Sequence, residues 1–71
     1  MRDSGVVRAF DPLKGFGFIR RDKGKDVFFF YTEISEDDKL IYVGDIVSFE
    51  IKQMDKGPRA FDVKKQGSLT V

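Results

Sequence analysis

The chain of 71 residues contains no cysteine, no histidine and no tryptophan, and only two prolines. Without cysteine there is no disulfide, no thiolate zinc site and no cysteine nucleophile. Without histidine the commonest metal ligand and general base is missing as well. We therefore expect no metal and no cofactor. No paired carboxylates, no nucleophile beside a base and no phosphate-binding glycine loop are apparent either, which argues against an enzyme.

Long apolar runs are also missing. Met1 is followed by Arg2 and Asp3, and no segment reaches the length of a signal-peptide core or a membrane-spanning helix. These features predict a soluble, cytoplasmic protein that does not contact membranes. The chain length permits one small domain. We expect this domain over residues 1–66, followed by a flexible tail over residues 67–71.

Aromatic and basic residues are concentrated in the first half of the chain. Seven of the ten aromatic residues lie between Phe10 and Tyr31. Residues 1–30 contain seven Lys/Arg against four Asp/Glu, whereas residues 31–71 contain six against eight. This polarity predicts one face that attracts an anionic partner and another that keeps the protein in solution.

The segment KGFGFIR at residues 14–20 alternates like a β-strand. Phe16 and Phe18 share one face with Lys14 and Arg20, while the two glycines and Ile19 share the other. Because burying unpaired charges is very costly, the phenylalanine face must point to solvent or to a ligand. Flat rings between cationic side chains suit single-stranded nucleic acid, which has stackable bases on an anionic backbone.

Alternating and β-forming residues predict five short strands separated by turn sequences. The expected strands cover residues 5–10, 14–20, 26–32, 46–51 and 59–64. The second and third strands are joined by a turn at 22–25, so we expect an antiparallel hairpin that brings their aromatic residues together. A short helical turn capped by Ser35 is expected over residues 34–38. Five strands without a stable helix favour a small closed barrel.

Four segments stand in the order and spacing of a cold-shock domain: GVVR at 5–8, KGFGFI at 14–19, DVFFFY at 26–31 and GP at 57–58. The chain thus resembles this family over nearly its whole length. RNA recognition motifs contain a string similar to KGFGFI, but there the companion motif precedes it and helices intervene. The resemblance implies an all-β, five-stranded antiparallel OB-fold barrel. It also implies binding of single-stranded RNA or DNA with low sequence specificity, and commonly RNA chaperone activity.

The resemblance also implies a set of binding residues. The first family string matches Lys14, Phe16 and Phe18, and the second matches Phe28, Phe30 and Tyr31. With the aromatic residue that ends the first strand, nearby cations and one further aromatic residue, the candidate nucleic-acid-binding set is Phe10, Lys14, Phe16, Phe18, Phe28, Phe30, Tyr31, Arg8, Arg20, Arg59 and Phe61. For Arg8 and Arg59, a solvated surface role is an equal alternative to phosphate contact.

Four features depart from the family pattern. Ala9 stands where the family usually has tryptophan, Phe30 stands where it has histidine, and the loop after Tyr31 lacks the usual aromatic residue. Phe61 occupies a position where the family tends to have a small residue. It either restores the stacking surface lost at Ala9 or fills core space beside Val63. With fewer stacking platforms, we expect less selective binding than is usual for the family.

A second hypothesis is a protein-interaction module. In this alternative the same aromatic face, or the segment 40–43 (LIYV), docks another protein or a second copy of the chain. The cations that surround the phenylalanines argue against it, because protein-binding hot spots are not typically ringed by lysine: Lys14, Arg20, Arg21, Lys23 and Lys25. We expect a monomer, with a dimer as the alternative.

Overall fold

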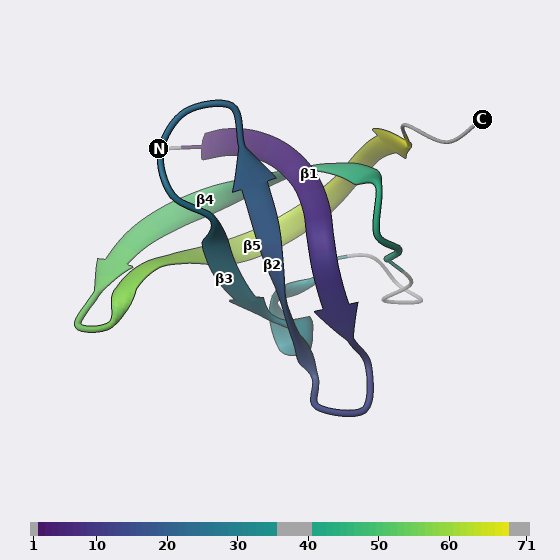
Figure 1. Ribbon diagram of the computed structural model, residues 1–71, viewed down its shortest axis with the longest axis horizontal. Helices are drawn as coiled ribbons and strands as arrows, with labels where there is room; N and C mark the ends of the chain where they lie inside the picture. The colour runs from purple at the N-terminus through teal and green to yellow at the C-terminus, as the bar shows by residue number, and fades with distance from the viewer. Residues whose placement is uncertain (1, 36–40, 69–71) are drawn as a thin grey trace.

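The computed structural model describes residues 2–35 and 41–68, which form five β-strands and one 3-10 turn, η1 (Figure 1). The elements are β1 Arg2–Asp11, β2 Phe16–Arg21, β3 Val27–Phe30, η1 Tyr31–Glu33, β4 Asp45–Met54 and β5 Gly57–Ser68. All five predicted strands are therefore confirmed. Among the described residues, no helix is long and apolar enough to cross a membrane.

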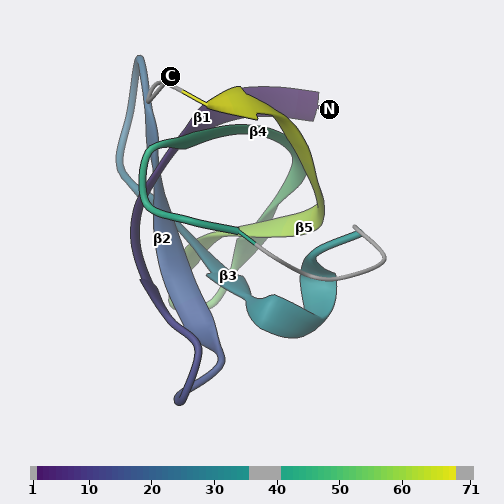
Figure 2. The same cartoon turned by 90° about the vertical axis from the view of Figure 1, so that its right-hand side faces the viewer.

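The strands close into a barrel in the order β1-β2-β3-β5-β4, and Figure 2 shows them curving round a common interior. The pairs β1–β2, β1–β4, β2–β3 and β4–β5 are antiparallel. The remaining pair, β3–β5, is parallel and joins Phe28 to Arg59. The predicted all-β OB-type barrel is confirmed, with one parallel pairing that closes the ring.

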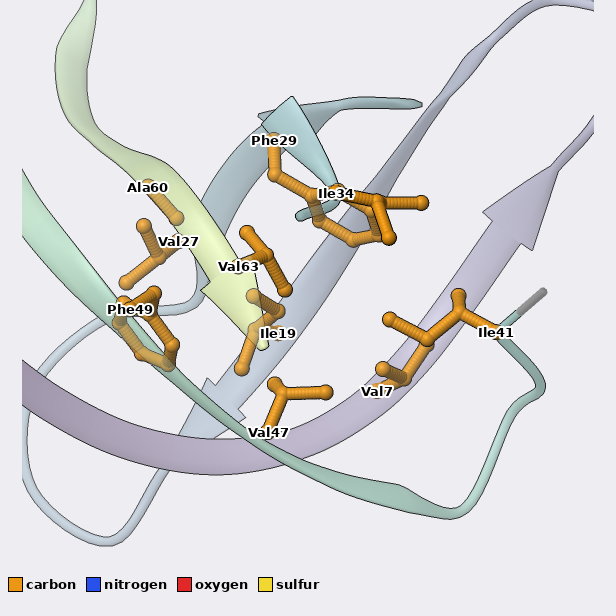
Figure 3. Close-up of a cluster of buried hydrophobic side chains, with 10 residues drawn as sticks. All are labelled: Val7, Ile19, Val27, Phe29, Ile34, Ile41, Val47, Phe49, Ala60 and Val63. Carbon is orange, nitrogen blue, oxygen red and sulfur yellow. The ribbon is translucent and has the colours of Figure 1, made fainter. Parts of the chain in front are cut away.

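The barrel interior is filled by ten buried side chains that converge from all five strands and from both sides of the β3–β4 connection (Figure 3). They are Val7, Ile19, Val27, Phe29, Ile34, Ile41, Val47, Phe49, Ala60 and Val63. Burying an aliphatic or aromatic side chain of this kind contributes about 1.5–3 kcal/mol relative to leaving it exposed. In so small a domain, this cluster is the main source of stability.

A β-bulge in β1 changes which side chains face the interior. The pairing of β1 with β2 shifts around Arg8, which is the extra residue. A one-residue bulge reverses the alternation beyond it. Ala9 consequently lies exposed opposite Phe18, and Phe10 turns toward the core. The Phe10 ring stacks on that of Phe29 with centroids 5.8 Å apart and an interplanar angle of 17°.

The second strand begins two residues later than predicted, because a turn occupies the start of the expected segment. The Asp11 carboxylate oxygen Oδ1 accepts hydrogen bonds from the backbone N–H groups of Leu13 at 3.0 Å and Lys14 at 3.2 Å. The Asp11 carbonyl accepts another from Gly15 at 2.8 Å. The prediction that Lys14 lies on the strand with Phe16 was therefore wrong, and Lys14 is exposed in the turn.

The predicted helical turn over residues 34–38 lies only partly within the described residues, where Ile34 forms a parallel β-bridge with Val63. β3 ends at Phe30, and the turn η1 follows immediately at Tyr31–Glu33. The backbone N–H of Ser35 donates to the carbonyl of Val63 at 2.7 Å, and its hydroxyl donates to Asp62. Residues 36–38 of the predicted turn lie outside the described residues.

The last strand is longer than predicted. Ser68 pairs with Asp45 and Gly67 pairs with Ile46, so β5 continues past the expected domain boundary at residue 66. The first two residues of the predicted tail therefore belong to the barrel. Residues 69–71 lie outside the described residues.

A second bulge, in β5, places Asp62 where β5 meets the start of β1 and the segment that contains Ser35. Asp62 and Val63 together face a single residue of β4, and Asp62 has a φ of 52°, a left-handed conformation that aspartate tolerates better than most residues. Its carboxylate accepts hydrogen bonds from the Ser35 hydroxyl and from Arg2 Nη1 at 2.9 Å. It also forms an ion pair with Lys64, whose Nζ lies 3.9 Å away. The hydrogen bond from Ser35, with those from Arg2 and the charge of Lys64, holds the pKa of Asp62 below its usual value, although partial desolvation opposes this.

Asp62→Asn is expected to lower the free energy of unfolding near neutral pH and to lose this effect in acid. The pKa of Asp62 is lower in the folded protein than in the unfolded chain, so its contribution is present above about pH 3.9 and disappears as the pH falls through the folded value. Denaturant unfolding of both proteins between about pH 7 and pH 2 measures the difference. Asp55→Asn, at an exposed position in the β4–β5 turn, is the matched control. A difference that stays constant over this range would contradict the assignment.

Candidate nucleic-acid interface

Four phenylalanine side chains form one cluster on the outer surface of the β2–β3 hairpin, and we call this cluster the aromatic face: Phe16, Phe18, Phe28 and Phe30. In the antiparallel register Phe16 pairs with Phe30 and Phe18 pairs with Phe28, so all four rings emerge on the same side. Phe18 is 39% exposed and Phe30 37%, whereas the residues that alternate with them are buried. The predicted orientation of both strands is confirmed.

Phe28 is the centre of the aromatic face. Its ring centroid lies 5.4 Å from that of Phe16, 5.6 Å from that of Phe18 and 4.8 Å from that of Phe30. The contacts with Phe18 and Phe30 are edge-to-face, with interplanar angles of 72° and 88°. Such contacts restrict the rotamers of each ring. The face is therefore ordered before a ligand arrives, which reduces the entropy lost on binding.

Gly17 allows the hairpin to pack tightly behind the aromatic face. A Cβ atom at this position would meet the backbone oxygen of Ala9 and approach the Phe29 ring to 2.9 Å. The requirement for glycine here is steric. Gly15 differs, because it has a φ of 77° in the β1–β2 turn.

The strand β5 adds two outward-facing side chains beside the aromatic face. Arg59 and Phe61 alternate with the buried Ala60. The Arg59 Cζ lies 4.3 Å from the centroid of Phe30 and 4.9 Å from that of Phe61. Lys52 of β4 places its Nζ 4.8 Å from the Phe61 centroid. Phe61 is half-buried against cations and outside the core cluster, which argues against the core-filling alternative.

Three predicted site residues lie exposed in other parts of the hairpin region. Tyr31 is 43% exposed in η1, and its backbone N–H donates to the carbonyl of Gly15 at 2.8 Å. Lys14 is exposed in the β1–β2 turn, and Arg20 is exposed near the end of β2.

Two predicted site residues are not brought into the cluster. The Phe10 ring stacks on Phe29 at the edge of the core and does not join the aromatic face. The Arg8 guanidinium forms an ion pair with Asp26, which offsets its charge. Both residues depend on the bulge in β1, because it sets the directions in which they point.

A groove of about 890 Å³ connects the aromatic face to the turn between β4 and β5. It is lined by Phe18, Phe28, Phe30, Gln53, Met54, Asp55, Lys56, Gly57, Pro58 and Arg59. This volume exceeds what one base requires. Lys52 and residues 53–58 were not predicted as site residues, since their position depends on the parallel β3–β5 pairing and no local sequence pattern reveals that pairing.

The segment 40–43 does not form a continuous apolar docking surface among the described residues. Ile41 is buried in the core, while Tyr42 is 61% exposed and Val43 60% exposed. Leu40 lies outside the described residues. The segment thus contributes one core residue and two isolated exposed ones, and isolated exposed apolar residues are common on protein surfaces.

A closed five-stranded barrel with stackable rings and cations on one outer surface has the architecture of OB-fold proteins that bind single strands. Comparison with known protein families agrees. The model of the 'Cold-shock' DNA-binding domain matches residues 3–66, and the chain belongs to this family. The family predicted from the sequence motifs is confirmed.

Individual relatives share most of their length with this chain. It is 46% identical over 61 residues to a cold shock-like protein of Thermotoga maritima, covering 84% of this chain and 92% of that protein. It is 41% identical over 64 residues to the cold shock protein CspC of Bacillus subtilis, covering 89% and 97% respectively. The structure is similar to that of drosophila Unr CSD456, with a TM-score of 0.81 and 25% identity over 100% of this chain and 29% of that one.

Proposed function

We propose that this protein binds single-stranded RNA or DNA through the aromatic face and acts as an RNA chaperone in the cytoplasm. The observation that carries the proposal is the ordered cluster of four outward rings, with Phe18 and Phe30 more than one-third exposed. An exposed cluster of this kind on a small domain marks a binding surface. Binding to unpaired bases favours the melted state of structured RNA, because the ligand shifts the equilibrium toward the form it binds.

The spacing of the rings suits a nucleotide chain. Same-face residues on a strand lie about 6.8 Å apart, a distance that an extended strand can follow with one base on each ring. Stacking contributes roughly 1–3 kcal/mol per base. Three or four occupied rings therefore give micromolar or tighter binding once the cost of ordering the strand is subtracted.

Cations around the aromatic face provide the electrostatic part of binding. Lys14 and Arg20 are exposed on the hairpin, and Lys52 lies on the β4–β5 side. We assign phosphate attraction to these side chains. Arg8 contributes less, since its pairing with Asp26 offsets its charge.

Titration with single-stranded oligonucleotides at several salt concentrations tests the proposal. We expect oligo-dT and oligo-U to change the tyrosine emission, which no tryptophan obscures, with Tyr31 as the tyrosine of the candidate site, and we expect a duplex of equal length to bind much more weakly. The logarithm of the association constant is expected to fall linearly with the logarithm of salt, with a slope of about −2 for three phosphate contacts. No response to either single strand at low salt would refute the proposal. Salt-independent capture of a protein would instead support the docking alternative.

A further inference from the structure

Arg59 is held by two aromatic rings and has no acidic partner among residues 2–35 and 41–68. Its guanidinium contacts the rings of Phe30 and Phe61. By contrast, Arg2, Arg8 and Arg21 each form an ion pair with a carboxylate. The charge of Arg59 is therefore available to a ligand at the border of the aromatic face.

The hydrogen-bond donors of Arg59 are also uncommitted. Its Nε is buried and has no hydrogen-bond partner among the described residues. A buried donor without an acceptor is rare in folded proteins and costly. The two rings fix the guanidinium in place, so less side-chain entropy is lost when an acceptor binds. This combination is typical of a side chain positioned for recognition.

The surroundings of Arg59 favour a base edge over a phosphate as the acceptor. Arg59 lines the groove together with Phe28, Phe30 and Asp55. A phosphate in this groove would lose water against apolar rings, which is unfavourable, and the opposite charges of Asp55 and Lys56 in the lining offset each other. A base that stacks on Phe28 or Phe30 brings its polar edge into the groove, while its phosphate remains outside in solvent.

We propose that Arg59 selects guanine at the nucleotide position beside Phe30. An arginine fork matches the O6 and N7 acceptors of guanine, which is the commonest specific contact between arginine and a base. Adenine has N7 but an amino donor in place of O6, and pyrimidines have no N7. The proposal rests on binding through the aromatic face. It predicts selectivity at one position of a site that otherwise binds with low specificity.

The test uses a series of labelled oligo-dT strands of about eight nucleotides, a length within the range that one OB fold covers. Each strand contains a single guanine at a different position, and fluorescence anisotropy measures its affinity. We expect one or two positions to raise the affinity about tenfold over all-thymine, which is the size of one bidentate arginine contact. Adenine at the same positions controls for stronger purine stacking, and 7-deazaguanine removes N7 alone. The adenine and 7-deazaguanine strands are both expected to lose most of the tenfold increase in affinity.

The matched protein variants are Arg59→Lys and Arg20→Lys. Lysine keeps the charge but lacks the planar fork, so Arg59→Lys is expected to abolish the guanine preference, measured as the ratio of the guanine-strand affinity to the all-thymine affinity of the same variant. Arg20 is exposed on β2, and the same change there is expected to keep the preference. Thermal unfolding verifies that both variants are folded, and the 7-deazaguanine result needs no variant.

The outcomes separate this inference from the proposed function. Equal affinity for the guanine and adenine series, with all-thymine bound normally, overturns the guanine assignment and leaves single-strand binding intact. A guanine preference that persists with 7-deazaguanine or in Arg59→Lys also overturns the assignment to Arg59, because another group then recognises the base. Failure to bind any single strand overturns both proposals.

Discussion

Phe28→Ala is expected to weaken binding of oligo-dT by about thirtyfold, which corresponds to about 2 kcal/mol. Phe28 contacts the other three rings of the aromatic face at centroid distances between 4.8 and 5.6 Å. The substitution removes one stacking platform and releases its neighbours from their fixed positions, so the loss exceeds that of a peripheral ring. Titration of the folded variant with oligo-dT at fixed salt measures the effect.

Tyr42→Ala is the control for this substitution. Tyr42 is 61% exposed, but its ring lies near Lys65 and makes no ring contact with the aromatic face among the described residues. We expect its removal to change the affinity less than about twofold, because the stacking platforms are intact. If Phe28→Ala remained folded and bound oligo-dT as tightly as wild type, the aromatic face would not be the binding surface.

The local alternation of the hairpin made much of the aromatic face predictable. A side chain on a strand can point only to one of two faces, so the charge of Arg20 at the end of the segment was sufficient to orient Phe16 and Phe18. The same rule assigned Phe29 to the core and Phe28 to the outside, as observed. These predictions need no knowledge of distant contacts.

The bulge in β1 shows where this reasoning fails. Simple alternation from Val7 places Ala9 inward and Phe10 outward, but the extra residue Arg8 exchanges their directions. A bulge is determined by how two strands pair, and the sequence of one strand contains little sign of it. The turn at Asp11 is a similar case, because its side-chain hydrogen bonds shortened the predicted second strand.

Arg59 and Phe61 of β5 were among the predicted site residues, but their placement beside the aromatic face could not be predicted, for a topological reason. Arg59 lies beside Phe30 only because β3 and β5, which are far apart in the chain, pair in parallel. Ala9 leaves the β1 side of the aromatic face without a ring, opposite Phe18. Phe61 adds a ring on the opposite side, beyond Arg59. We infer that the stacking surface of this protein is displaced from β1 toward β5, relative to the pattern expected for the family.

Phe29→Ala is expected mainly to lower the stability of the barrel, and Phe30→Ala mainly to weaken oligonucleotide binding, although the two residues are adjacent and identical in type. Phe29 is fully buried, stacks on Phe10 and lies against Gly17. Its truncation is expected to lower the free energy of unfolding by about 3–5 kcal/mol, a large share of the total for a small domain. Phe30 is 37% exposed, and its truncation is expected to cost about 1 kcal/mol or less while weakening oligonucleotide binding about tenfold.

Denaturant unfolding and oligo-dT titration of both variants distinguish the two roles. If Phe29→Ala is unfolded at room temperature, Phe29→Leu provides a milder change at the same position, and we expect it to be less stable than wild type with near-normal affinity once folded. The decisive comparison is between the two measurements for each variant. A large loss of stability in Phe30→Ala with unchanged affinity would show that its ring supports the barrel, and the outer surface of the hairpin would then need another explanation.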